Sequence, residues 1–264
     1  MRKMVVLFVV VVLCLAGLFF AGGFTKTPSL RIKGSTTIQP MMDVFSEEYE
    51  KTSGVIIDIM GGGSGVGINS VMNGLADIGM SSRELKPGEG DGLVRIPIAI
   101  DIIVIIVNSD VSGVENLTQT DIIGIFSGNI TNWSELGGPN LKILPVIREA
   151  GSGTRDFFEG ISGPMPDDAR YPLVTSNGAM VITVNNTPGA IGYVSIGSVT
   201  HECTVLKYNG REASDAGYEL SRELLLFTKG TPTGDAAVFI DWILNSPKAQ
   251  EILISMGFLP ITQP

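Results

Sequence analysis

Hydroxyl side chains, glycines and two arginines are concentrated in one stretch, residues 148–155 (REAGSGTR). It follows the apolar run 141–147, which predicts a buried strand, and precedes Asp156, which could open a helix. A Gly-Ser-Gly-Thr turn between a strand and a helix would place free backbone N–H groups at the positive end of a helix dipole. Arg148 and Arg155 could each hold an oxyanion through paired hydrogen bonds. The stretch predicts an anion site; the alternative is an ordinary capped glycine turn with surface arginines.

Two further stretches have the same chemistry. Residues 34–40 (GSTTIQP) follow a short strand at 30–32 and precede a helical pattern that runs to about residue 52. Residues 61–67 (GGGSGVG) follow a strand at 55–60 and precede a helical pattern. Three strand–turn–helix junctions could bring three helix N-termini to one small anion. One such junction indicates little, but three of them together with an arginine favour an anion site.

The N-terminus predicts export from the cytoplasm. Arg2 and Lys3 precede an uncharged apolar run at residues 4–24, which is typical of a signal peptide or a membrane anchor. The run is also about long enough to span a bilayer, since ~20 apolar residues suffice. The two alternatives cannot be separated, and in both the remaining chain lies outside the cytoplasm.

Charge and composition exclude several classes of site. Removing Arg2 and Lys3 from the 18 basic residues leaves 16 against 27 acidic residues, a net charge of −11. Such a chain is not expected to bind nucleic acid through a basic surface. Beyond residue 27 only Cys203 and the single His201 remain, so we expect neither a disulfide nor a metal site, and no cofactor.

Alternating strand and helix patterns predict an α/β fold with a largely parallel sheet. The apolar run 96–107 is too long for an ordinary strand and is interrupted by Asp101. We interpret it as a strand that passes from one lobe to another, with Asp101 at the crossing; the alternative is a bend with Asp101 facing solvent. Apolar spacing over 234–256 predicts two helices separated at Pro247.

These stretches resemble the PstS family, the phosphate-binding proteins of ABC phosphate importers, in its short form. The matching motifs run in the family's order through nearly all of the exported part: GSTT at 34–37, GGGSGVGI at 61–68, SSREL at 81–85, ITNWSELGG at 130–138, REAGSGTR at 148–155 and PGAIGYV at 188–194. The motifs at 130 and 148 are the most specific.

The resemblance implies a type II periplasmic-binding fold, in which two α/β lobes joined by a two-strand hinge enclose phosphate. The implied division is 1–27 for the signal peptide or anchor, 28–102 and 222–264 for lobe 1, and 103–221 for lobe 2. The resemblance also implies that Arg148 is the charge partner of the anion, with Glu149 or a neighbouring carboxylate restraining its guanidinium. The candidate phosphate-binding residues are Ser35, Thr36, Thr37, Ile38, Ser64, Ser82, Arg83, Asp101, Arg148, Ser152, Gly153 and Thr154.

One of these positions departs from the family's long form. There an aspartate stands where this chain has Ser82, and it accepts the proton of hydrogen phosphate, which excludes sulfate. We hypothesise that Asp101 supplies the acceptor here. Without such a carboxylate, sulfate, molybdate and tungstate remain alternative ligands.

The resemblance implies capture of phosphate by lobe closure and delivery to the permease subunits of an ABC transporter. We expect an extracytoplasmic monomer that contacts the membrane only if the N-terminal segment is not cleaved. A surface phosphate sensor or adhesin is an alternative. An enzyme such as a phosphatase is not expected, because no nucleotide-binding or hydrolase motif occurs and metal ligands are lacking.

Overall fold

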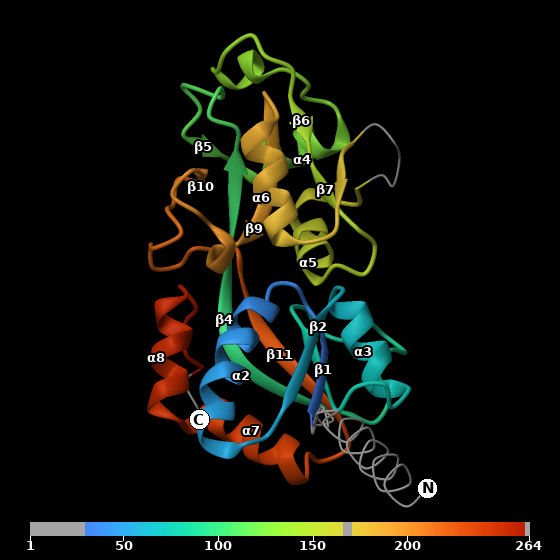
Figure 1. Cartoon of the computed structure of the whole chain (residues 1–264). Helices are drawn as coiled ribbons and strands as arrows, with labels where there is room; N and C mark the ends of the chain where they lie inside the picture. Colours follow the sequence, from blue (N-terminus) through green and yellow to red (C-terminus); the bar gives the residue numbers. More distant parts are fainter. Residues whose placement is uncertain (1–29, 166–170, 262–264) are drawn as a thin grey trace, which may run out of the picture.

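Two large hydrophobic cores divide the chain into two α/β lobes, which Figure 1 shows one above the other. The computed structural model describes residues 30–165 and 171–261. The core of lobe 1 draws on residues 30–99 and 224–258, and the core of lobe 2 on residues 103–220. The lobe limits predicted from the sequence stay a prediction, because buried clusters define cores and not the ends of domains.

Lobe 1 begins with two strand–helix units whose strands are parallel. Their elements are β1 (Leu30–Gly34), α2 (Gln39–Ser53), β2 (Ile57–Gly61), α3 (Ser64–Met72) and β3 (Ile78–Ser81). Strand β1 lies between β2 and β3 and pairs with both in parallel register. Apolar residues of α2, including Met41, Met42 and Phe45, lie on one face and are fully buried. The strands therefore end, and the helices begin, at the same edge of the sheet.

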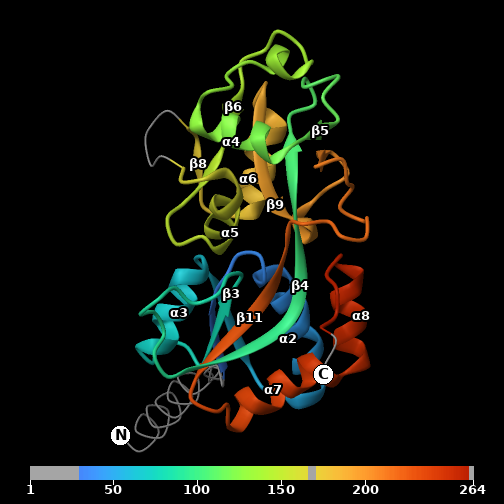
Figure 2. The same cartoon turned by 180° about the vertical axis from the view of Figure 1, so that it is seen from behind.

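Strand β4 (Leu93–Val107) belongs to both lobes, and Figure 2 shows it running from one into the other beside β11 (Ser221–Lys229). Its first part pairs antiparallel with β11 as far as Ile102. Its second part pairs with β9 (Ala190–Ser195) and β10 (Thr204–Tyr208). The predicted crossing strand is thus one continuous element. Asp101 is fully buried at the crossing, so the alternative of a solvent-facing bend is wrong.

The main sheet has the strand order β2-β1-β3-β11-β4-β10-β5 among the described residues, with β9 pairing β4 and β6. Strand β11 runs antiparallel to both of its neighbours, so the sheet is mixed rather than largely parallel as predicted. The α/β fold class itself is confirmed.

Lobe 2 surrounds the second part of β4. Its other elements are β5 (Asn116–Leu117), α4 (Gln119–Ser127), η1 (Trp133–Leu136), β6 (Leu144–Pro145), β7 (Ile147–Arg148), α5 (Gly153–Ser162), β8 (Leu173–Val174), α6 (Asn177–Asn186) and η2 (Ile196–Ser198). The single strand predicted at 141–147 is wrong. The chain leaves the main sheet after β6 pairs with β9, and β7 then pairs with β8 in a separate sheet. The last bond of the first ladder is donated by the Val146 amide to the Ile191 carbonyl oxygen at 2.8 Å, and Ile147 then pairs with Leu173.

The C-terminal helices α7 (Gly234–Asn245) and α8 (Pro247–Ser255) pack on lobe 1, beside α2 (Figure 1). Tyr49 of α2 contacts the rings of Phe239 and Trp242 of α7, with centroids 4.9 and 5.5 Å away. The predicted break at Pro247 is confirmed, since α8 begins there. Among residues 30–165 and 171–261, no helix is long and apolar enough to cross a membrane. The apolar run at 4–24 lies outside the described residues.

Helix α3 lies unusually close to the sheet because Gly67 has no side chain. A Cβ on Gly67 would lie 2.5 Å from the carbonyl oxygen of Met80 and 2.8 Å from that of Lys33. Both atoms are backbone and cannot move independently of the strands. Glycine here sets the distance between the helix and strands β1 and β3.

We predict that Gly67→Ala lowers the free energy of unfolding by ~1–3 kcal/mol, because the added methyl group pushes α3 off the sheet. Urea denaturation measures the change. Gly160→Ala is the matched control: Gly160 is exposed in α5 with nothing within 4 Å of an added Cβ. That change should raise stability by ~0.5–1 kcal/mol. Equal effects of the two substitutions would contradict the close packing of α3.

Candidate functional site

Four buried hydroxyl groups meet where the two lobes face each other. Thr37 and Thr154 lie with their Oγ1 atoms 3.1 Å apart, and they come from lobe 1 and lobe 2 respectively. Ser64 and Ser82, both in lobe 1, have their Oγ atoms 3.2 Å apart, and the Ser82 amide donates to Ser64 Oγ at 3.0 Å. All four side chains are at most 2% exposed. Buried hydroxyls in mutual contact are donors that can turn to a ligand.

The N-termini of three helices supply three of these four groups, as the sequence predicted, and Ser82 follows strand β3. Thr37 precedes α2, Ser64 opens α3 and Thr154 stands in the first turn of α5. Helix α5 begins at Gly153, three residues earlier than the helix start suggested at Asp156, because Ser152 caps it. First-turn amides have no acceptor within their own helix, so they add donors and a partial positive charge.

Gly153 brings the lobes together at this point. A Cβ on it would lie 2.3 Å from Ser64 Oγ and 2.6 Å from Ser82 Oγ. The backbone of α5 in lobe 2 therefore touches the hydroxyl pair of lobe 1. Any side chain at this position would separate the two lobes.

Arg148 lies at the edge of the hydroxyl cluster and is 1% exposed. Its Nε and Nη2 atoms donate to the two carboxylate oxygens of Glu149, both at 2.8 Å. Its remaining contacts are Nη1 to Asn177 Oδ1 at 3.3 Å and Nη2 to Thr36 Oγ1 at 3.2 Å, so it reaches across to lobe 1. The hydroxyl of Tyr193 accepts from the Arg148 amide at 3.3 Å and helps to fix the backbone.

A second buried arginine, Arg222, approaches the same cluster from the hinge. Its Nε and Nη2 atoms donate to Asp101 Oδ2 at 3.1 and 2.9 Å, and Ser195 Oγ donates to Asp101 Oδ1 at 2.6 Å. Burial raises the pKa of the Asp101 carboxyl, and the charge of Arg222 opposes that rise. Burial also lowers the pKa of the Arg222 guanidinium, against the effect of Asp101. Each charge is compensated by its partner.

The remaining predicted residues are placed differently. Ser35 Oγ accepts from the Thr37 amide, and Ser152 Oγ accepts from the Arg155 amide, so both hydroxyls act as local caps. Ile38 is fully buried in the lobe 1 core at the start of α2. Asp101 contacts Arg222 and Ser195 and none of the four clustered hydroxyls.

Two arginines that the sequence placed at the site point elsewhere. Arg83 directs its guanidinium to Glu89 and to Asp156, and not to the clustered hydroxyls. Arg155 donates to Glu159 Oε1 at 2.8 Å and to the backbone carbonyl oxygens of Arg148 and Met165, and its contact with an anion stays a prediction. It supports the loop that carries Arg148.

Sequence reasoning missed Arg222 and Asn177. Asn177 Nδ2 donates to Thr37 Oγ1 at 2.8 Å, and Arg222 Nη2 donates to Thr37 and Thr154 at 3.2 and 3.0 Å. The available signal for Arg222 was Asp101, since a buried carboxylate requires a buried cation. Asn177 opens α6 and carried no motif that the sequence analysis used.

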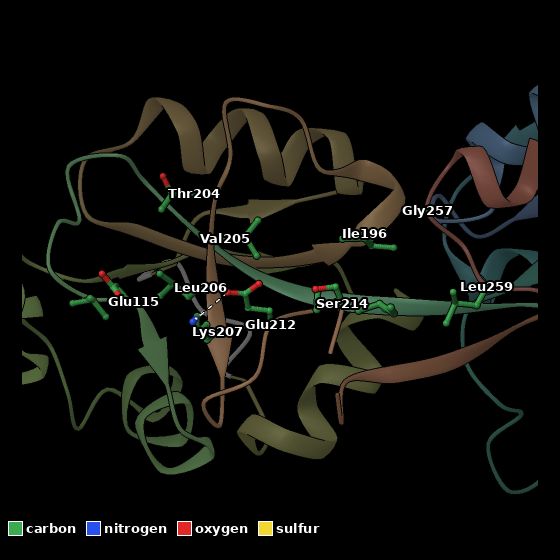
Figure 3. Close-up of a pocket in the computed structure, with 13 residues that line it drawn as sticks. Glu115, Ile196, Thr204, Val205, Leu206, Lys207, Glu212, Ser214, Gly257 and Leu259 are labelled. Atoms are coloured by element: carbon green, nitrogen blue, oxygen red, sulfur yellow. Dashed lines mark ion pairs between the residues drawn. The ribbon is translucent and has the colours of Figure 1, made fainter. Parts of the chain in front are cut away.

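A cavity of about 790 Å³ lies away from the hydroxyl cluster and is shown in Figure 3. Its lining is mostly apolar and includes Ile196 and Leu206 of lobe 2 and Leu259 of the C-terminal segment. Lys207, the basic residue in this lining, is paired with Glu212 at 3.2 Å. The hydroxyl cluster, with its concentrated donors, is therefore the better candidate for an anion than this mostly apolar cavity.

Known proteins agree with this architecture. The PBP superfamily domain matches residues 22–247. The phosphate-binding protein PstS of Bacillus subtilis (strain 168) is 31% identical over 244 residues, 89% of this chain and 81% of the relative. PstS of Borreliella burgdorferi is 29% identical over 252 residues, 87% of this chain and 89% of the relative.

Two solved structures are similar over most of the chain. One, from Clostridium perfringens, is described as a phosphate ABC transporter substrate-binding protein with bound phosphate. It has a TM-score of 0.83 and 34% identity, and covers 88% of this chain and 99% of its own. The other is an ABC-type phosphate transport receptor from Vibrio cholerae, with a TM-score of 0.73 and 31% identity over 88% of this chain and all of its own.

Ion pairs between Asp156 of lobe 2 and two basic residues of lobe 1, here called the rim ion pairs, join the two lobes beside the hydroxyl cluster. Asp156 of lobe 2 lies 2.7 Å from Arg83 Nε and 3.0 Å from Lys86 Nζ, both of lobe 1. We predict that Asp156→Asn makes the ligand-free protein more open, with a larger radius of gyration in small-angle X-ray scattering. The substitution removes one charge-assisted hydrogen bond, from Lys86 Nζ, and the ion pair with Arg83. Such a hydrogen bond is worth ~1.5–3 kcal/mol when buried, and less here because Lys86 is half-exposed.

Asp77→Asn is the matched control, because Asp77 pairs with Arg31 within lobe 1. It should leave the radius of gyration unchanged. If Asp156→Asn gives the wild-type scattering curve, the rim ion pairs do not hold the closed form.

Proposed function

The chain belongs to the PstS family of phosphate-binding proteins within the PBP superfamily, and on this premise we propose that it captures inorganic phosphate and delivers it to an ABC transporter. The observation that carries the proposal is the buried cluster of hydroxyls between the lobes, with Arg148 and three helix N-termini around it. Tetrahedral oxyanions are bound well by many short, charge-assisted hydrogen bonds in a site that excludes water.

Each lobe contributes part of the proposed phosphate site. Thr36, Thr37, Ser64 and Ser82 come from lobe 1, whereas Arg148, Gly153 and Thr154 come from lobe 2. The anion would replace the hydroxyl–hydroxyl contacts between Thr37 and Thr154 and between Ser64 and Ser82. Neither lobe alone should bind it strongly. Ligand would therefore shift an open–closed equilibrium toward the closed form, which the transporter recognises.

Local dipoles reconcile anion binding with the net charge of −9 of the full chain. Both arginines near the cluster are paired with carboxylates, Arg148 with Glu149 and Arg222 with Asp101. The site would attract phosphate through oriented donors at close range, since longer-range repulsion is screened beyond ~10 Å at ordinary salt. The relatives are binding proteins by name, and the proposed activity of this chain is likewise capture without catalysis. We propose that the protein acts as an extracytoplasmic monomer.

A second candidate ligand is another tetrahedral oxyanion: sulfate, molybdate or tungstate. The observation that favours it is that the clustered side chains are hydroxyls and none is a carboxylate. A hydroxyl can donate to a fully ionised oxygen as well as accept from a protonated one. Ser82 would then provide weaker discrimination than an aspartate would.

Titration calorimetry of the ligand-stripped exported domain tests the proposal with phosphate, sulfate, molybdate and tungstate. We expect tight phosphate binding in the wild type. Arg148→Met should weaken it about 100-fold, because charged hydrogen bonds contribute ~1.5–3 kcal/mol each. Arg211→Met, which removes an exposed arginine of lobe 2, is the control and should bind as the wild type does. Binding of another oxyanion in preference to phosphate would change the substrate, and no binding of any would refute the proposal.

The hypothesis that Asp101 accepts the phosphate proton stays a prediction. Its contacts with Arg222 and Ser195 favour a different role, in which it holds Arg222 at the site. If Asp101 only holds Arg222 in place, Asp101→Asn should weaken the binding of phosphate and of sulfate by a similar factor. Calorimetry at constant pH measures both affinities. A selective gain of sulfate binding would instead assign the acceptor to Asp101. Asp58→Asn, on the exposed face of β2, is the control.

A further inference from the structure

Arg222 is placed on the hinge and contacts both lobes at once. It pairs in register with Asp101 across the two antiparallel crossing strands, β11 and β4. Its guanidinium reaches Thr37 of lobe 1, and Thr154 Oγ1 and the carbonyl oxygen of Gly153 in lobe 2. The side chain is 4% exposed. A charged group so deeply placed on the hinge is expected to have a function beyond packing.

The hydrogen bonds to Thr37 fix the direction of its hydroxyl proton. Thr37 Oγ1 accepts from Asn177 Nδ2 at 2.8 Å and from Arg222 Nη2 at 3.2 Å. The orientation of the Asn177 amide follows from Arg148, which can only donate and contacts Asn177 Oδ1. A hydroxyl oxygen has two lone pairs, and both are used here. Thr37 can therefore only donate to whatever else it meets.

Thr154 is constrained through the same network. One Nη2 hydrogen of Arg222 is directed to Asp101, so the other is shared between the Oγ1 atoms of Thr154, at 3.0 Å, and Thr37, at 3.2 Å. Thr154 Oγ1 also lies 3.1 Å from Thr37 Oγ1. Because the acceptors of Thr37 are occupied, Thr154 cannot donate to Thr37. Its proton is left for a ligand. The hydroxyls of Ser64 and Ser82 contact each other and the Ser82 amide, and either hydroxyl can be the donor in their mutual hydrogen bond.

We propose that Arg222 and Asn177 are positioning residues that make Thr37 and Thr154 obligate donors, so that this half of the site selects unprotonated oxygens of the anion. The inference rests on the proposed function. On this proposal, a phosphate oxygen that carries a proton binds at Ser64 and Ser82, whose hydroxyls can accept. The doubly charged form of phosphate, which carries one proton, fits this division better than the singly charged form, which carries two.

The ionisable groups that face Arg222 are Asp101 on β4 and Arg148 on β7, and Arg148 is itself paired with Glu149. The loop before α2 and helices α6 and α5 present Thr37, Asn177 and Phe157, none of which titrates between pH 6 and 8. Binding that changes between these pH values would report mainly on the charge of phosphate.

Calorimetric phosphate titrations at pH 6 and pH 8 test the assignment through the ratio of the two affinities. Asn177→Ala frees an acceptor on Thr37 without changing any charge. The double variant Asp101→Asn with Arg222→Met frees acceptors on both threonines and also keeps the net charge. We expect the wild type to bind phosphate more tightly at pH 8 than at pH 6. In each variant the ratio of the two affinities should fall about threefold or more, because one hydrogen bond contributes a free energy of that size. The double variant Asp77→Asn with Arg31→Met, a charge-neutral change at an exposed pair, should leave the ratio unchanged.

A merely structural role would weaken binding equally at both pH values, and that result overturns the proposal. Thermal unfolding shows whether the double variant folds. If it does not fold, the ratio of affinities in Asn177→Ala alone tests the positioning role. A wild type that binds no phosphate at either pH refutes the proposed function itself. A wild type that binds phosphate, with variants that retain its pH ratio, refutes only the positioning role.

Discussion

A buried charge requires a partner, and the pairing of Asp101 with Arg222 satisfies this constraint at the centre of the molecule. The two residues stand opposite each other on the only strands of the described chain that cross between the two cores, β4 and β11. Removing either partner would leave an uncompensated ion, which is far more costly than an exposed one. The pair also directs a guanidinium to hydroxyls of both lobes. The hinge and the anion site are therefore one hydrogen-bonded unit.

Oriented dipoles, more than net charge, distinguish the site from the rest of this acidic surface. The helices α2, α3 and α5 direct their N-termini to it, and glycines within α3 and α5 allow the backbones to approach closely. Gly153 and Gly67 show this most clearly, because a methyl group at either would strike atoms of another element. Close approach also lets hydroxyls of different lobes meet at hydrogen-bonding distance. The arrangement depends on backbone geometry that few other residues could permit.

The sequence predicted features that depend on local patterns. The strand–turn–helix junctions, the break at Pro247 and the crossing strand all follow from apolar spacing and turn residues, and the structure contains each of them. Long-range features were missed for a physical reason. The partner of Asp101 is 121 residues away, and Asn177 approaches Thr37 from 140 residues away, so no local pattern could identify them. The division of 141–147 between two sheets was missed for the same reason, because it depends on partner strands elsewhere in the chain, β9 and β8.

The discontinuity of lobe 1 has a consequence for the order of folding. Lobe 2 is formed by one uninterrupted stretch, whereas the core of lobe 1 needs β11, α7 and α8 from the end of the chain. In a chain that emerges from its N-terminus, lobe 2 can complete its core while lobe 1 still lacks the strand between β3 and β4. Helix α2 can complete its packing only after residues nearly two hundred positions later have been synthesised, because Tyr49 packs against Phe239. Late closure of lobe 1 should make its assembly the slower step, since long-range pairing slows folding.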